Sequence, residues 1–396
     1  VAYVTTAEKP ADSDGTEIWQ DQWDLLYKSA IEQTGSEKLD RLDSVIAGWA
    51  GVENLDAQVT EWIDTTVERI RGFGGRRIFE IGCGTGQILS RLAAESECYW
   101  AADISKIAIE ALENNHPLPQ VKLFHRPAVL KGNIAFWRRV FAEYSERQSV
   151  IHDLRKPDRI YAVLDYRADA AVLSKVQLSR QQNEGEESTK ARIASALRGA
   201  AALVDIPEQM NSEQRRLAAL FAGDESALSD AADYIRSQRG LQERTRQAVE
   251  ISGQYLPEME RIFADAGLPR LLTRLPIVES SFNINAYSKV AAAGLWQFMP
   301  SSARLYMRHN QIADERRDPW TSTRAAAAHL KDDYDHLGSW PLALTAYNYG
   351  RGGVARALRE SNSSSFDEML VRFNGPRFGF ASRNFYAEFL AATDVE

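Results

Sequence analysis

The sequence predicts a mixed fold class, in which a partial α/β segment is followed by an all-α remainder. A short apolar strand, a glycine-rich turn and a helix start follow one another over residues 77–92, which is typical of an αβ unit. From Ala191 to Gly267 apolar residues recur at helical spacing, and no strand pattern returns after Val204. At 396 residues the chain is too long for one ordinary hydrophobic core, so we expect two or three domains.

Composition and charge limit the classes of function. Hydrophobic residues make up 44% and charged residues 26%, as in soluble globular proteins. Residues 1–130 carry 12 Lys/Arg against 21 Asp/Glu, whereas residues 131–396 carry 35 against 34, so neither part is basic enough to indicate nucleic-acid binding. No stretch approaches the roughly 20 apolar residues of a transmembrane helix. The first ten residues lack the pattern of an export signal, although a leader could precede Val1.

The first 75 residues are polar and rich in tryptophan, and we expect them to be helical. Trp19, Trp23, Trp49 and Trp62 are spaced among acidic residues. From Val59 to Ile70 the apolar residues fall at helical spacing, which predicts one amphipathic helix.

A glycine-rich loop follows this helix and is the first candidate site. Gly82, Gly84 and Gly86 come after a short strand that contains Glu80, and they allow a tight turn and a close approach of a ligand to the backbone. A second strand ends on Asp103, where an acid can hold a ribose hydroxyl group. The alternative is a glycine-rich turn in some other αβ unit.

This segment resembles the class I S-adenosylmethionine-dependent methyltransferases, and more narrowly the methyltransferase domains of nonribosomal peptide and polyketide synthetases. The resemblance implies a half Rossmann-like sheet and S-adenosylmethionine as the cofactor. It implies that the cofactor loop holds Glu80, Gly82, Gly84 and Gly86, and that Asp103 binds the ribose.

The resemblance stops early, so we expect residues 1–128 to be a truncated and inactive methyltransferase-like domain. After a third strand near Val121, the doubly wound fold should continue with several more strands, but Ile134 opens a new amphipathic helix. Half a sheet would leave an apolar edge strand unpaired and one cofactor wall missing. Both cysteines, Cys83 and Cys98, lie in this part, which also differs in charge from the remainder. We therefore hypothesise a fusion of unrelated coding sequences.

The second candidate site is the stretch from Leu275 to Pro300. Glu279 follows an apolar run, and the next carboxylate in the sequence is Asp314. Burial disfavours the charged form of a carboxyl group, so a carboxyl group in apolar surroundings is a candidate general acid. The alternative is a helix-terminal glutamate that points into water.

Two later segments carry aromatic and amide side chains of the kind that bind sugars. Tyr347 and Asn348 follow an apolar helix, and aromatic residues recur from Phe378 to Phe389. Aromatic faces stack on sugar rings, and amide and hydroxyl groups hydrogen-bond to sugar hydroxyl and acetamido groups. The alternative for each aromatic residue is a place in the core.

Together, Glu279-Ser-Ser-Phe, the stretch from Ala286 to Pro300 and Ala-Tyr347-Asn348 resemble the lytic transglycosylases of bacterial peptidoglycan, in particular the membrane-bound D type. The resemblance covers about residues 134–395. It implies a mostly helical segment at 129–267 and a lysozyme-like all-α catalytic domain at 268–396.

The resemblance also implies the roles of individual residues. Glu279 is the catalytic acid and then the base, and the substrate-binding residues are Ser288, Gln297, Met299, Tyr347, Asn348 and Tyr386. One departure is Ala291, where relatives have glycine. Because alanine suits a helix better than glycine, we expect local stiffening there and no loss of activity.

The lone carboxylate indicates the type of reaction. A retaining glycosidase needs a second carboxylate about 5–5.5 Å from the acid, and an inverting one needs a base farther away. None lies between Glu279 and Asp314, although folding could bring Asp314, Glu315 or Asp318 opposite Glu279 and give a hydrolase. The family instead forms 1,6-anhydromuramic ends without water.

We therefore expect a lytic transglycosylase that acts on peptidoglycan strands in the periplasm or cell envelope, with no cofactor and no metal. The alternatives are a methyltransferase in residues 1–128 and a non-enzymatic glycan-binding module, which would bind sacculi without turnover.

Overall fold

The computed structural model describes residues 55–396 except 75, 106, 110–111, 113–120 and 223. The predictions for Trp19, Trp23 and Trp49 lie outside the described residues. The chain divides into two compact units, residues 1–129 and residues 130–396.

The described part of the first unit is a three-stranded parallel sheet with helices. Its sheet has the order β1-β2-β3, and the helix expected at 59–70 forms as α3. Ile63 and Val67 of α3 pack with Leu89 in the core. The elements are α3 (Leu55–Gly72), β1 (Arg77–Ile81), α4 (Gln87–Leu92), β2 (Cys98–Asp103) and β3 (Val121–His125).

Strand β1 lies at the edge of this sheet and exposes apolar side chains. It pairs with β2, and Phe79 and Ile81 are 42% and 66% exposed. Parallel sheets are normally covered on both faces and continued at their edges. Among the described residues the sheet has three strands, and β1 leaves this apolar surface exposed.

The second unit is mostly helical and contains one small sheet. Its helices and strands are α6 (Lys131–Ala142), β4 (Gln148–Asp153), β5 (Ile160–Asp165), α7 (Lys175–Ala202), α8 (Ser212–Ala218), β6 (Ile235–Arg239), α9 (Gln242–Ser252), α10 (Leu256–Asp265), α11 (Leu275–Ser280), α12 (Pro300–Tyr306), α13 (Pro319–Leu337), α14 (Trp340–Tyr349), α15 (Arg351–Glu360), α16 (Phe366–Arg372) and α17 (Phe380–Val395).

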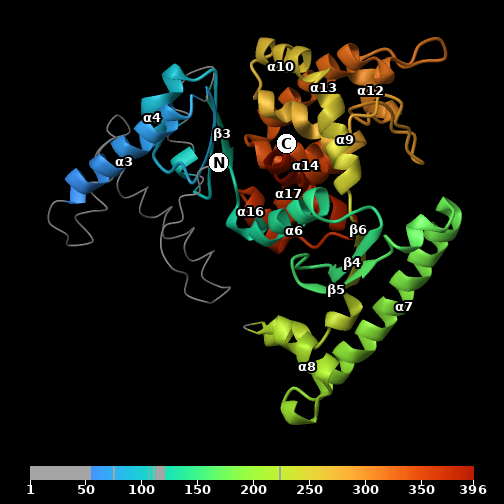
Figure 1. The fold of residues 1–396 in the computed structure, drawn as a ribbon. Coiled ribbons are helices and arrows are strands. Elements are labelled where there is room, and N and C mark those ends of the chain that lie inside the picture. Colours follow the sequence, from blue (N-terminus) through green and yellow to red (C-terminus); the bar gives the residue numbers. More distant parts are fainter. Residues whose placement is uncertain (1–54, 75, 106, 110–111, 113–120, 223) are drawn as a thin grey trace. The chain divides into compact units, whose positions relative to one another are not determined.

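The prediction that no strand follows Val204 is wrong, because Ile235–Arg239 form β6. The sheet is antiparallel with the order β5-β4-β6. The sequence of β6, Ile-Arg-Ser-Gln-Arg, has one apolar residue and no apolar alternation, so its strand character comes from pairing with β4, whose Val150 and Ile151 are fully buried. Helix α7 packs on this sheet (Figure 1), and its Ile193 belongs to the same hydrophobic core as Ile151 of β4.

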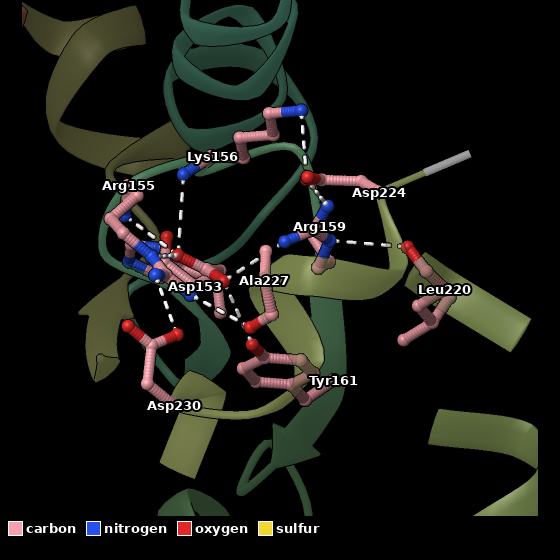
Figure 2. A network of polar contacts seen from close by, with 10 residues as sticks. Asp153, Arg155, Lys156, Arg159, Tyr161, Leu220, Asp224, Ala227 and Asp230 are labelled. Carbon is pink, nitrogen blue, oxygen red and sulfur yellow. Dashed lines mark hydrogen bonds and ion pairs between the residues drawn. The ribbon is translucent and has the colours of Figure 1, made fainter. Parts of the chain in front are cut away.

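Asp153, the last residue of β4, is the centre of a buried polar network that ties the sheet to the chain before β6 (Figure 2). Its carboxylate accepts hydrogen bonds from Arg159 and from the Tyr161 hydroxyl group, each at 3.1 Å. Arg159 also donates to Asp224 at 2.7 Å, and Lys156 donates to the same carboxylate at 2.9 Å. Because a buried charge needs partners, this network fixes the end of β4.

Helix α17, at the end of the chain, packs against α6, at the start of the unit (Figure 1). Asn384 of α17 accepts hydrogen bonds from Asn133 at 2.9 Å and from the Trp137 indole N–H at 3.0 Å. α17 also packs against α11 and α14. It therefore connects the start of the unit to the two helices that carry Glu279 and Tyr347.

Candidate active site

Glu279 lies in the last turn of the short helix α11, next to an unusual stretch of backbone. The helix ends at Ser280, and the next two residues, Ser281 and Phe282, have φ values of +53° and +55°. Non-glycine residues with positive φ are uncommon, and of the five among the described residues four lie between Ser281 and Gln297. Such strain persists where the surrounding structure enforces it, and it is typical of functional sites.

Glu279 lines a cavity of about 380 Å³, within the size range of ligand sites. Glu279 as a whole residue is half-buried. The cavity is lined by Ile277, Val278, Glu279 and Ser280 of α11, by Ser281, Asn283, Ala286 and Tyr287 after it, and by Phe141, Leu241, Arg244, Thr245 and Glu388.

Burial raises the pKa of Glu279 to about 8, and the charge of Glu388 adds to the effect. At neutral pH the group is therefore mainly protonated and can donate its proton to a leaving group. The surroundings that the sequence predicted for Glu279 are present, and the alternative of a fully solvated glutamate does not describe this structure.

Glu388, on α17, is a second carboxyl group in the same cavity, and sequence reasoning missed it. Burial raises its pKa to about 8 as well, while the charge of Arg236 acts in the opposite direction. The sequence left open Asp314, Glu315 and Asp318 as second carboxyl groups opposite Glu279, and Glu388 was not among them. The sequence contains no local signal for this pair, because the two residues meet only through the packing of α17 against α11.

The three acids that could have faced Glu279 have structural partners instead. Asp314 binds Arg316, which lowers the pKa of that carboxyl group to about 2. Glu315 accepts hydrogen bonds from Arg308, and Asp318 caps α13. None of these acids lines the cavity.

Arg316 stabilises the loop that follows Glu279, residues 281–299, through hydrogen bonds to its backbone. Arg316 is 2% exposed and donates hydrogen bonds to the carbonyl groups of Ala291 at 2.6 Å and Phe298 at 3.0 Å. The backbone of Arg316 also approaches Gly294 closely, because a Cβ atom at position 294 would lie 1.9 Å from the Arg316 carbonyl oxygen. Glycine is therefore required at position 294 by close approach as well as by its φ of +79°.

Ser288 and Gln297 hydrogen-bond within this loop. The Ser288 hydroxyl oxygen accepts hydrogen bonds from the backbone N–H groups of Ala292 at 2.9 Å and Val290 at 3.3 Å. The Gln297 amide donates to the carbonyl group of Gly294 at 2.9 Å, and Gln297 has a φ of +47°. Both side chains thus shape the loop, and neither lines the cavity of Glu279.

Ala291 is not in a helix, so the reason given for its stiffening effect is wrong. It lies in a turn between Ser288 and Ala292 and has a φ of +67°. An L-residue pays about 1–2 kcal/mol for this conformation, whereas glycine does not. Alanine here therefore strains the loop that carries Ser288 and Gln297.

We expect Ala291→Gly to stabilise the protein by about 0.5–1 kcal/mol, because glycine relieves the positive φ while adding some freedom to the unfolded chain. Thermal unfolding measured by calorimetry would test this. As a control, Ala355→Gly inside α15 should destabilise the protein by about 1 kcal/mol. A loss of stability in Ala291→Gly would contradict the expectation.

Tyr347 lies close to Glu279 from a separate helix, α14. Its hydroxyl group donates to the carbonyl group of Trp296 at 2.7 Å. Burial raises the pKa of Tyr347 well above its usual value, and the charge of Glu279 adds to this effect, so the phenol stays neutral. The structure therefore brings Tyr347 within electrostatic reach of the acid.

The remaining predicted residues lie outside the cavity. Asn348 is exposed, and its side-chain oxygen accepts a hydrogen bond from Ser382 at 2.9 Å. Met299 is 40% exposed at the start of α12. Tyr386 has no exposed surface and packs its ring against Phe366 and Phe389. Substrate contacts of these residues stay predictions.

The two cavity carboxyl groups should make stability depend on pH. Their pKa values are about 8, raised from 4.5, so the folded state binds more protons than the unfolded state between these values. Stability therefore falls as the pH rises from about 4.5 to about 8. We expect the double variant Glu279→Gln, Glu388→Gln to lose this fall and to be more stable than the wild type at pH 8.5, by on the order of 1–3 kcal/mol.

Calorimetric scans of both proteins at pH 5, 6.5 and 8.5 would measure this effect. Their difference removes the contributions of all other titrating groups. If stability changes equally with pH in the two proteins, burial does not disfavour the charged forms of Glu279 and Glu388.

In the first unit the glycine loop forms, and the two acidic side chains beside it, Glu80 and Asp103, accept hydrogen bonds from groups of the same unit. Asp103 is 7% exposed and accepts hydrogen bonds from the backbone N–H groups of Gly84 and Ser105, each at 2.8 Å. Glu80 accepts one from the Tyr99 hydroxyl group at 2.9 Å, and burial raises its pKa to about 7. The ribose-binding role of Asp103 and the binding of S-adenosylmethionine stay predictions. The loop glycines have the positive φ values of tight turns: Gly82 +78°, Gly84 +50° and Gly86 +81°. Across the described ranges, no group of His, Cys, Asp and Glu residues could hold a metal ion.

Part of the second unit matches a known protein family. Residues 261–370 match the family model of the transglycosylase SLT domain. The membrane-bound lytic murein transglycosylase D of Escherichia coli strain K12 is 40% identical over 100 residues, which are 24% of this chain and 22% of that protein. This chain therefore spans less than a quarter of that relative's length.

Two further similarities are more distant. The nonribosomal peptide synthetase TES of Alternaria alternata is 29% identical over 115 residues, which are 27% of this chain and 2% of that protein. Such synthetase matches lie on another segment and are compatible with the methyltransferase-like part. The X-ray structure of an inactive mutant of the lytic transglycosylase Slt from Pseudomonas aeruginosa covers 98% of this chain and 75% of that chain, at 16% identity and a TM-score of 0.28, which is too low to indicate a shared fold.

Proposed function

We propose that the transglycosylase SLT domain at residues 261–370 makes this chain a peptidoglycan lytic transglycosylase, with Glu279 as general acid and then base. The observation that carries the proposal is the cavity carboxyl group of Glu279, whose pKa of about 8 keeps it protonated at neutral pH. The substrate is the β-1,4 bond between N-acetylmuramic acid and N-acetylglucosamine.

The reaction starts with proton transfer from Glu279 to the glycosidic oxygen. The bond from that oxygen to C1 of the muramic acid residue breaks, and the glucosamine residue leaves with a free hydroxyl group. The acetamido oxygen of the muramic acid residue captures the electron-deficient C1. The C6 hydroxyl group then attacks C1, expels the acetamido oxygen and gives its proton to the Glu279 carboxylate. The acid is regenerated, and the product is a 1,6-anhydro ring.

Glu388 bears on the choice between this reaction and hydrolysis. An inverting or retaining hydrolase would need its second carboxyl group ionised, as a base or a nucleophile. Burial of Glu388 raises its pKa to about 8, so the group is mainly neutral at pH 7 and is a poor base there. This supports the non-hydrolytic reaction, although the cavity contains two carboxyl groups.

Product analysis would test the proposal. Purified sacculi are incubated with the chain, treated with borohydride and analysed by mass spectrometry, since anhydro ends resist reduction and hydrolysed ends do not. We expect anhydro ends. Reducible ends would indicate a hydrolase, and binding to sacculi without any release would indicate a glycan-binding module.

The relatives also bear on location and on the alternative function. The Escherichia coli relative is described as membrane-bound, so we place the enzyme in the cell envelope. In the described part of the chain, no helix is long and apolar enough to cross a membrane.

Methyl transfer by residues 1–128 is the alternative function, and calorimetric titration with S-adenosylmethionine would detect micromolar binding if that part were functional.

A further inference from the structure

Glu388 faces the catalytic cavity from outside the SLT segment. It lies on α17, whereas the family model ends at residue 370. α17 packs against α11, so Glu388 and Glu279 line one cavity of about 380 Å³ from two helices. Two carboxyl groups that share a site disfavour each other's ionisation, and the protons of such a pair are lost in coupled steps.

The charge of Arg236, on strand β6 before the SLT segment, acts on Glu388. Its guanidinium group stacks over the ring of Phe380, the first residue of α17, at 4.3 Å. Its Nε atom is buried without a hydrogen-bond partner, and the charge it interacts with is that of Glu388. On the neighbouring strand β4, His152 lies opposite Arg236 in the strand pairing. The centres of the His152 and Phe380 rings are 5.7 Å apart. The sheet thus supplies a half-buried cation whose charge acts on Glu388.

We infer that Glu388 is a positioning residue that acts through Glu279: its carboxyl group favours the protonated, acid form of Glu279, and Arg236 sets the strength of this effect. The inference rests on the proposed role of Glu279. As the pH rises toward 8, Glu388 ionises, and its negative charge then opposes ionisation of Glu279. The positive charge of Arg236 lowers the pKa of Glu388, so without Arg236 this opposing charge would form only at a higher pH.

Other charged groups near Glu388 are already paired or neutral. From α9, Arg244 lines the cavity, and its guanidinium group binds Glu146 at 3.0 Å. From α6, Arg138 pairs with Asp394 at 3.7 Å. From the turn before α11, Arg274 binds Glu260 and Glu396. Tyr347 of α14 stays neutral, and Tyr287 is the remaining titratable group on the cavity wall. His152 stays neutral as well, because burial lowers its pKa to about 4.

The test is the pH dependence of anhydromuropeptide release from sacculi. In Glu388→Gln the alkaline limb of the rate profile should move to lower pH by about one unit, because Glu279 loses the charge that opposes its ionisation. The position of the limb is measured separately from the plateau rate, so a change in the plateau alone does not count as a shift. Arg236→Met keeps an apolar stem over Phe380 and should move the limb in the same direction by a smaller amount.

The controls separate this effect from a structural one and from failure of the proposed function. Glu360→Gln removes an exposed carboxylate of α15 and should leave the limb in place. Glu388→Asp keeps a carboxyl group, so its alkaline limb should lie between those of Glu388→Gln and the wild type. An unmoved limb in both Glu388→Gln and Arg236→Met would overturn the inference, even if the rate fell. A wild-type chain that forms no anhydro product would overturn the proposed function instead.

Discussion

Glu279→Gln should release anhydromuropeptides from purified sacculi at least about 100-fold more slowly than the wild type, since general acid catalysis contributes roughly 10²–10⁴-fold. Glutamine has the shape of glutamate but cannot transfer a proton to the glycosidic oxygen. It also cannot accept the proton of the C6 hydroxyl group in the second step. Release is measured by chromatography of the soluble products at a pH below 8, where Glu279 is protonated in the wild type.

Folding is not expected to limit this variant. Because the folded state disfavours the charged form of Glu279, an amide at this position should raise stability at pH 8 and leave it little changed at pH 4.5. Glu360→Gln is the matched control, as an exposed carboxylate with an ion pair on α15, and should be fully active. Unchanged release by Glu279→Gln would show that another group is the acid.

Gly294→Ala should destabilise the protein by more than about 3 kcal/mol and remove activity. The added Cβ atom would lie 1.9 Å from the carbonyl oxygen of Arg316 and 2.8 Å from its carbonyl carbon. These are backbone atoms of a residue that is 2% exposed and holds Asp314, so they cannot move aside cheaply. The loop that carries Gln297 would have to shift. Thermal unfolding and release from sacculi would measure the two losses.

Gly338→Ala is the matched control for the backbone conformation. Gly338 ends α13 with a φ of +74°, close to the +79° of Gly294, but an added Cβ atom there meets nothing within 4 Å. It should cost only the roughly 1–2 kcal/mol of a left-handed alanine. Equal losses in the two variants would show that close approach to Arg316 does not matter.

Local features of this chain were predictable from sequence. The strand, loop and helix start at 77–92 form, because each depends on a few neighbouring residues. The apolar surroundings of Glu279 also form, since the run before it makes one short buried helix. Such features need no knowledge of distant contacts.

Features that depend on tertiary packing were not predictable. The polar strand β6 forms because β4 offers it a partner, and Glu388 reaches Glu279 because α17 folds back onto α11. The positive φ of Ala291 follows from the loop that Arg316 holds, whereas the residue type alone favours a helix. In each case the deciding contact joins segments far apart in the chain.

The acid and the wall that faces it lie on separable segments of the gene. Glu279 belongs to the SLT segment, while Phe141, Thr245 and Glu388 on the same cavity lie before and after it. Mutations in those flanking segments can alter the shape and charge of the cavity while the acid motif stays constant. Transfer of residues 261–370 into another protein would carry the acid but leave part of the cavity wall behind.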